Sequence, residues 1–143
     1  MFWHEFIWLH TSSFLQYVTT HDLKDRLPSS KWSYPVKSLQ GHVIYSSWEK
    51  FWDGNIDMSL QQAEVIYDNY SSSSAAAGGT GFWTGTKSDG TFSGDNCRDW
   101  SSGATLDNGT WGSFLIKDSS LWIDNGTKKS CYAYSYFLCF MYN

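Results

Sequence analysis

Residues 82–96 read FWTGTKSDGTFSGDN, and this stretch decides the fold of the chain. Short apolar groups alternate in it with polar turns at Ser88–Gly90 and Ser93–Asn96. Similar turn signals follow downstream, where Asp-Asn-Gly occurs at Asp107–Gly109 and again at Asp124–Gly126. Asp-Gly and Asn-Gly pairs favour the tight turns that join antiparallel strands. The second half of the chain is therefore expected to form a mostly antiparallel sheet.

The C-terminal run predicts the central strand of that sheet. Aromatic and aliphatic residues dominate Tyr132–Tyr142, and such a run suits a strand that is buried on both faces. Shorter apolar runs predict further strands, although Phe14–Val18 also fits the start of a helix. These runs are Phe6–Leu9, Phe14–Val18, Val43–Tyr45 and Glu64–Tyr67.

Helical structure is expected only in the first half of the chain. The segment SWEKFWDG at residues 47–54 spaces its aromatic side chains three and four apart, so they share one face of a short helix. A serine at 46 or 47 caps its start, and Asp53-Gly54 ends it. The polar segment 19–35 is expected to be a loop with about one helical turn. The fold class is therefore α+β, with one or two short helices, a mostly antiparallel sheet and long loops.

A chain of 143 residues has room for a single domain, residues 1–143, which buries about two thirds of its unfolded surface. Lys and Arg total 10 against 14 Asp and Glu, so the net charge is -4. This balance argues against nucleic acid as a partner and against a strong heparin or anionic-membrane surface, because polyanion binding needs clustered positive charge. No apolar run approaches the roughly 18 to 20 residues that span a bilayer, so no membrane span is expected.

The aromatic content is the unusual feature of the composition. Phe, Trp and Tyr make up 19% of the residues, which allows either a heavily aromatic core or a surface for stacking on sugars. An indole face matches the apolar face of a pyranose, so the tryptophans of the second half are candidates for ligand binding, with core packing as the alternative for each. They are Trp83, Trp100, Trp111 and Trp122.

Residues 71–81 read SSSSAAAGGTG, which has almost nothing to bury and is expected to be a solvated loop insertion. Its GGTG is not followed by the Lys-Ser/Thr pair that a phosphate-binding loop needs. Asn-x-Ser/Thr sequons in expected loops are candidate glycosylation sites if the chain enters a eukaryotic secretory pathway, with chance matches as the alternative. Their asparagines are Asn69, Asn108 and Asn125.

No catalytic or metal-binding constellation stands out in the sequence. The histidines are scattered without acidic residues at ligand spacing, which is typical of ordinary surface or half-buried side chains. They are His4, His10, His21 and His42. No Gly-x-Ser-x-Gly motif marks a nucleophilic serine. We therefore expect no enzyme activity, no metal site and no cofactor, and a hydrolase built from scattered Ser and Asp residues is the disfavoured alternative.

Several short motifs follow one another from Pro35 to the end of the chain. They are Pro35-Val36, SWEKFWDG at 47–54, Trp83-x-Gly85, Cys97-x-x-Trp100 and a closing Cys131-x7-Cys139. In this order they resemble the endostatin domain of basement-membrane collagens, which has a C-type-lectin-like fold. The second half is also similar to uncharacterised bacterial secreted lectin-like domains. The order of the motifs over residues 35–143 carries the resemblance, since each motif alone is short.

The resemblance implies a state for each cysteine. Cys97 and Cys131 would form a disulfide that closes roughly 35 residues and stabilises the fold by about 3 to 4 kcal/mol, with two reduced, buried thiols as the alternative. In the family, the last cysteine pairs with one near the start of the domain, and this chain has no cysteine before Cys97. Cys139 is therefore expected to be an unpaired thiol, and the domain to be N-terminally incomplete, without its first strand and helix.

The resemblance further implies a non-enzymatic, secreted module that recognises proteins or glycans at an extracellular matrix or cell surface. Its candidate ligand-binding residues are Trp83, Trp122, Asp124 and Asn125. Asp124-Asn125 after Trp122 is similar to a lectin signature for calcium and sugar, but Asp-Asn-Gly is first of all a turn and the partner motif Glu-Pro-Asn is missing.

The alternative function is a structural appendage of a collagen-like or surface protein, part of a larger or trimeric chain, with no specific ligand. A calcium-dependent sugar-binding lectin is the less favoured third hypothesis. Residues 1–10, MFWHEFIWLH, lack the positive start and small-residue cleavage site of a secretory signal, so extracellular localisation rests on the resemblance.

Overall fold

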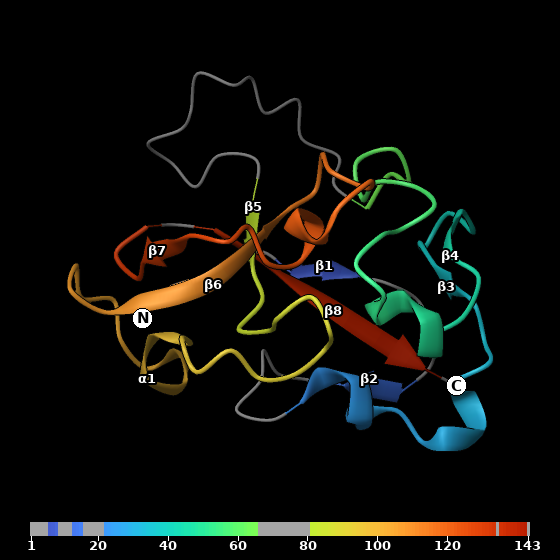
Figure 1. The fold of residues 1–143 in the computed structure, drawn as a ribbon, viewed down its shortest axis with the longest axis horizontal. Coiled ribbons are helices and arrows are strands. Elements are labelled where there is room, and N and C mark those ends of the chain that lie inside the picture. Colours follow the sequence, from blue (N-terminus) through green and yellow to red (C-terminus); the bar gives the residue numbers. More distant parts are fainter. Residues whose placement is uncertain (1–5, 9–12, 16–21, 66–80, 134, 143) are drawn as a thin grey trace.

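A computed structural model of the chain describes residues 6–8, 13–15, 22–65, 81–133 and 135–142 (Figure 1). The predicted loop insertion lies outside the described residues apart from Gly81. Among the helices that the structure describes, none has the length and apolar character to cross a membrane. The described part is a small α+β protein with few helices.

Six strands of the described residues form one sheet around β8 (Tyr136–Tyr142). The others are β1 (Phe6–Trp8), β2 (Ser13–Leu15), β5 (Gly81–Trp83), β6 (Asn108–Ser113) and β7 (Lys128–Ser130). The path runs β1-β8-β5-β6-β7, and β2 pairs with the C-terminal end of β8 (Figure 1). The prediction that the aromatic C-terminal run is the central strand is confirmed.

The sheet is mixed, which corrects the expectation of a mostly antiparallel arrangement at its centre. Both β1 and β5 run parallel to β8, and Phe137 of β8 pairs with Phe6 on one side and Trp83 on the other. The pairs β2–β8, β5–β6 and β6–β7 are antiparallel. Parallel neighbours need a long crossover, and residues 84–135 provide it between β5 and β8. Turn signals predict hairpins, and they carry no information about such crossovers.

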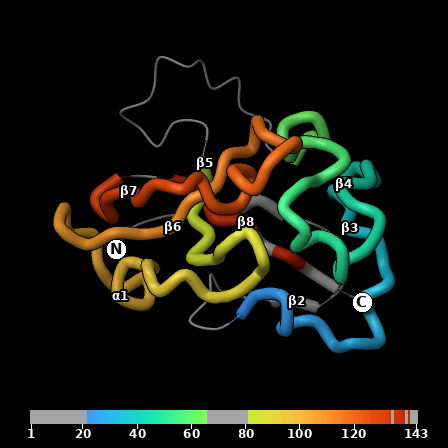
Figure 2. Tube along the Cα trace, viewed as in Figure 1, coloured from blue at the N-terminus to red at the C-terminus, as the bar shows by residue number. Residues whose placement is uncertain are grey.

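Smaller elements surround the sheet. β3 (Val36–Lys37) and β4 (Val43–Tyr45) form a separate antiparallel pair, so the strand predicted at Val43–Tyr45 is confirmed. Four segments of the described chain form 3-10 turns: η1 (Leu23–Arg26), η2 (Ser29–Lys31), η3 (Glu49–Trp52) and η5 (Ser120–Trp122). Figure 2 shows that β3 and β4 lie on the opposite side of the molecule from β7 and α1 (Cys97–Trp100).

The turn η3 is the helix that the SWEKFWDG segment predicts. The Lys50 amide donates to Ser47 Oγ at 3.3 Å, but the N-cap position is Trp48, one residue later than the predicted serine, and its side chain makes no capping hydrogen bond. Asp53 follows its last residue, and Gly54 adopts φ 103°, a value that favours glycine and stops the helix. The two turns η1 and η2 occupy the segment for which one turn was expected.

The main core lies between η3 and one face of the sheet. Phe51 is fully buried, and its ring centroid is 5.7 Å from that of Phe140 on β8 and 4.6 Å from that of Trp122. Trp48 stands edge-on to Phe140 at 5.2 Å. Phe140 packs on this face and Phe137 on the other, so β8 is buried on both faces as predicted.

Three local predictions are wrong. Helical turns are not confined to the first half of the chain, since α1 and η5 lie in the second half. Asp107–Gly109 is not a turn, because strand β6 begins at Asn108 and Gly109 pairs with Lys129 of β7. Glu64 belongs to a turn with φ 55° and not to a strand; the remainder of that predicted strand reaches residues outside the described ranges. The turns at Ser88–Gly90 and Asp124–Gly126 are present, each ending in a glycine with positive φ.

Candidate functional site

The second face of the sheet carries a row of aromatic rings. Trp83 of β5 stands opposite Trp111 of β6 and beside Phe137 of β8, and residues that pair across a sheet share a face. Gly109 makes room for this row, since a Cβ there would meet Trp83 Cζ3 at 2.8 Å and Cys97 Sγ at 3.0 Å. The ring row therefore packs directly on a disulfide.

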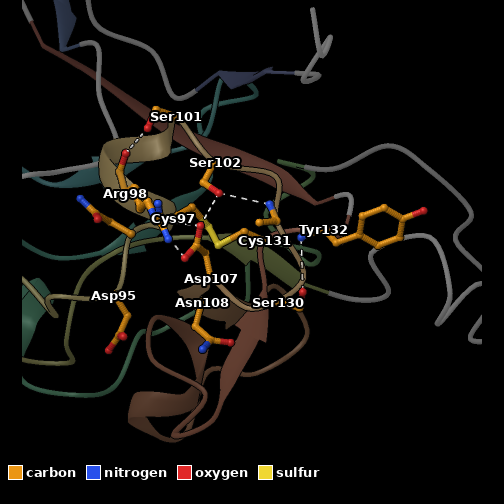
Figure 3. The surroundings of a disulfide bond; sticks show 12 residues. Asp95, Cys97, Arg98, Ser101, Ser102, Asp107, Asn108, Ser130, Cys131 and Tyr132 are labelled. Carbon is orange, nitrogen blue, oxygen red and sulfur yellow. Dashed lines mark hydrogen bonds and ion pairs between the residues drawn. A yellow bond between two sulfur atoms is a disulfide. The ribbon is translucent and has the colours of Figure 1, made fainter.

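That disulfide joins Cys97 to Cys131 (Figure 3), as the resemblance implies. The Cα atoms are 5.6 Å apart, and the Cys131 amide donates to the Asp107 carbonyl at 2.9 Å. Cys97 is 4% exposed and Cys131 is partly buried. The backbone of Cys139 belongs to β8, but its side chain is outside the described part of the structure. Its predicted free thiol therefore stays a prediction.

The segment that carries Cys97 is a left-handed helical turn. The φ angles of its residues are all positive, which side chains with a Cβ rarely adopt. They are 55° at Cys97, 54° at Arg98, 56° at Asp99 and 60° at Trp100. A left-handed residue with a Cβ costs about 1–2 kcal/mol, and Asp is among the residues that tolerate this conformation best. Such a conformation persists only where its surroundings hold it.

Hydrogen bonds hold the turn from its N-terminal side. Asn96 Oδ1 accepts from the Asp99 amide at 3.1 Å, and Asn96 Nδ2 donates to Asp99 Oδ1 at 2.8 Å. The Trp100 amide donates to the Asn96 carbonyl at 2.8 Å, and the Ser102 amide to the Cys97 carbonyl at 3.0 Å. The Asn96 side chain thus accepts from the Asp99 amide, and the Asn96 and Cys97 carbonyls accept the backbone bonds that close the turn.

Asp107 holds the same turn from outside. Its carboxylate accepts from Ser102 Oγ and lies 2.9 Å from Arg98 Nε (Figure 3). The Ser102 hydroxyl and, after it, the Arg98 guanidinium hold the pKa of Asp107 below its ordinary value. The carboxylate therefore stays charged at neutral pH and ties both ends of the turn to the start of β6.

A pocket of about 170 Å³ opens between this turn and the ring row; we call it the disulfide pocket. Its lining residues are Trp83, Cys97, Trp100, Ser101, Ser102, Gly103, Cys131, Tyr132, Ala133 and Phe137. The Trp100 ring lies 5.9 Å from that of Trp83 and 5.2 Å, edge-on, from that of Phe137. Within the described residues, the buried indole N–H of Trp100 has no acceptor.

Lys129 lies over two rings of the ring row and is not among the residues that line the pocket. Its Nζ is 5.6 Å from the ring centroid of Trp83 and 5.2 Å from that of Trp111, and it donates to Ser135 Oγ at 3.4 Å. Burial removes water from the ammonium group and lowers the pKa of Lys129 to about 8. The ring faces attract the charged form and offset part of that loss.

The walls of the disulfide pocket are mainly apolar. The hydroxyls of its two lining serines are already engaged, since Ser101 Oγ donates to the Arg98 carbonyl and Ser102 Oγ to Asp107. In the described part of the chain, no group of three or more His, Cys, Asp or Glu side chains could hold a metal ion. Its apolar walls are ring faces and edges, which favour an aromatic or pyranose ring.

The structure divides the candidate tryptophans between the two faces of the sheet. Trp83 and Trp100 line the disulfide pocket, and Trp111 lies in the adjoining ring row. Trp122 is 0% exposed in the main core, against the Phe51 ring, which fits the core-packing alternative that the sequence left open for each tryptophan.

The lectin-like pair Asp124-Asn125 forms a turn beyond the ring row. Asp124 Oδ1 accepts from the Gly126 amide at 3.1 Å, and the Asn125 amide donates to the Trp111 carbonyl at 2.8 Å. Neither residue lines the disulfide pocket. The first bond is that of an Asx turn, which is the alternative that the sequence left open, and the second joins the turn to β6.

The sequons fall in different settings. Asn108 is exposed but begins strand β6, which corrects its expected place in a loop, and its partner Thr110 is fully buried. Asn125 stands in a turn, and its Oδ1 accepts from Thr127 Oγ1 at 3.4 Å. Asn69 lies outside the described residues.

Sequence reasoning missed Tyr132, Ser101 and Ser102 as pocket residues. Tyr132 is 70% exposed and points away from the disulfide (Figure 3), so no burial pattern marks it. The one sequence feature that points to the turn beside the pocket is Asn96-x-x-Asp99. Asn and Asp adopt a left-handed backbone more readily than other residues with a Cβ.

Comparison with known proteins leaves the family open. No protein-family model matches the chain, and neither does any curated protein or solved structure. The endostatin-like resemblance of the motifs therefore stays a prediction. The structure itself shows an α+β class with mixed and antiparallel sheets.

Proposed function

We propose that the protein is a non-enzymatic extracellular recognition module whose disulfide pocket takes one ring of a glycan or protein ligand. A single observation carries the proposal: the rings of Trp83, Trp100 and Phe137 converge on one open pocket. The order of endostatin-like motifs supports a recognition role. The disulfide supports an oxidising compartment, because such bonds persist outside the cytosol.

The size of the pocket supports a single ring as its occupant. An apolar cavity of about 150 Å³ accommodates benzene, and the disulfide pocket measures about 170 Å³. A pyranose or an aromatic side chain has these dimensions and offers a face to the indoles. An acceptor atom on the ligand that reached the Trp100 indole N–H would give that buried donor its missing partner.

A matched pair of tyrosine variants tests the proposal. The oxidised protein is screened on glycan and peptide arrays, and its best hit is titrated against Tyr132→Ala and Tyr34→Ala. Tyr132 lines the pocket, whereas Tyr34, 55% exposed, precedes β3, a strand that lies on the opposite side of the molecule from β7 and α1 (Figure 2). We expect about a tenfold loss of affinity for Tyr132→Ala, which is 1.4 kcal/mol, and none for Tyr34→Ala.

Calcium separates this proposal from the lectin hypothesis. We expect equal affinity in calcium and in a chelator, because the pocket walls are rings and hydroxyls. Absence of any ligand on the arrays, or equal affinity for both tyrosine variants, would contradict binding at the pocket. Binding that disappears in the chelator would favour a calcium-dependent site elsewhere in the chain.

A further inference from the structure

The left-handed turn and the disulfide share a residue. Cys97 begins the turn and is bonded to Cys131, and Trp100, three residues on, forms a wall of the pocket. The position of Trp100 therefore depends on a backbone conformation that is anchored covalently at its first residue. Both cysteines also line the pocket that the turn encloses.

We propose that the Cys97–Cys131 disulfide is a redox switch for the disulfide pocket: reduction releases the left-handed turn, withdraws Trp100 and opens the pocket. This inference rests on the proposed function, because the consequence of the switch is that the protein loses its ligand under reducing conditions. The release of the turn itself can be measured without any ligand.

The side-chain hydrogen bonds of the turn join residues that are close in the chain, whereas the disulfide joins it to Cys131, 34 residues on. Arg98 and Asp99 each carry a Cβ in the left-handed region, where that atom crowds the following carbonyl. The Arg98–Asp107 ion pair is exposed on the arginine side, so salt screens it. Asn96 bonds to Asp99 at one end of the turn, and at the other end Ser101 Oγ donates to the Arg98 carbonyl and Ser102 Oγ to Asp107. Once Cys97 is free, right-handed or extended conformations become available to the segment.

The geometry gives a reductant one route to the bond. Cys97 is nearly buried and Cys131 is the more accessible partner, so a thiolate of a dithiol reductant attacks Cys131 Sγ from the pocket. The Cys97 sulfur leaves as a thiolate and takes up a proton. The second thiol of the reductant then displaces Cys131, so that the reductant is oxidised to a cyclic disulfide and the protein gains two thiols.

The switch is reciprocal. An occupant of the pocket shields Cys131 and stabilises the conformation that only the oxidised protein holds. Coupling between two equilibria acts in both directions. Reduction lowers the affinity for the ligand by some factor, and bound ligand lowers the equilibrium constant for reduction of the disulfide by the same factor.

Hydrogen exchange before and after reduction tests the switch in the full chain. The protein is held with and without dithiothreitol, and exchange is followed at residues 97–102 and, as an internal reference, at η3 and β4. We expect exchange at 97–102 to accelerate at least tenfold on reduction while η3 and β4 keep their protection. Unchanged protection at 97–102 would overturn the proposal, as would an equal loss in all three segments, which would show global unfolding instead of a local switch.

Two variants of Arg98 test the cause. Arg98→Gly removes the Cβ at φ 54°, and Arg98→Ala keeps it; both lose the ion pair with Asp107. After reduction, we expect Arg98→Gly to retain more protection at 97–102 than Arg98→Ala. Equal exchange in the two reduced variants would contradict a release driven by the left-handed backbone. Failure to find an array ligand would count against the proposed function and leave these exchange results standing.

Discussion

At the scale of single residues, Gly109 shows how packing overrides a turn signal. Its Asp-Asn-Gly context predicts a tight turn, yet the residue lies inside β6 opposite Lys129. It is glycine because the Trp83 ring and the Cys97 sulfur occupy the space of a side chain. The sequence shows the glycine but not the ring that approaches it from another strand.

Replacing Gly109 with alanine should therefore destabilise the protein. A Cβ within 2.8–3.0 Å of Trp83 and Cys97 forces the ring row off the sheet, and overpacking of this kind costs about 1–3 kcal/mol. Urea denaturation measures the loss. Asn108→Ala, at the exposed neighbouring position, is the control and should change the free energy of unfolding by less than about 0.5 kcal/mol. Equal stability of the two variants would show that the site has room to spare.

Lys129 makes stability depend on pH in a defined window. Its pKa is about 8 in the folded protein against an ordinary value of 10.5, so the unfolded chain holds the extra proton between these values. The free energy of unfolding should therefore rise with pH across that window. Denaturation from about pH 7 to 10 checks this, with Lys129→Met as a variant of similar length that cannot titrate. If the free energy of unfolding rose equally with pH in both proteins, a titrating group other than Lys129 would be responsible.

At the scale of elements, the sequence predicts what neighbours along the chain determine. The strand Val43–Tyr45, the helical turn η3 and the glycine turn at Ser88–Gly90 each depend on local spacing and capping, and the structure contains all three. The left-handed turn α1 does not follow from local preference, because Cys, Arg and Trp disfavour it. A disulfide to a residue far along the chain holds it instead.

Most of what η3 contributes to the stability of the fold should come from the buried ring of Phe51. Phe51 contacts both Phe140 and Trp122, and truncation of a buried phenylalanine costs about 3–5 kcal/mol. Phe51→Ala should lower the free energy of unfolding by that amount, while Lys50→Ala, exposed on the same turn, should leave it nearly unchanged. Chemical denaturation compares the two. A small effect of Phe51→Ala would mean that η3 is peripheral to the core.

At the scale of the whole molecule, the two faces of the central sheet differ in content. One face packs on η3 and η5 and forms the main core, where Trp122 is enclosed. The other carries Trp83, Trp111 and Phe137 and leaves the disulfide pocket open. The aromatic composition allows either a core or a stacking surface, and it cannot assign each tryptophan to one of them. That assignment depends on strand register, which the parallel crossover to β8 sets.

The cysteine pairing is the most direct test of this account, because the left-handed turn, the pocket and the switch all depend on it. The unreduced protein is alkylated, digested and mapped by mass spectrometry. We predict one cross-linked pair of peptides that joins Cys97 to Cys131, with Cys139 recovered as the alkylated thiol. A bridge from Cys131 to Cys139, or from Cys97 to Cys139, would contradict the account.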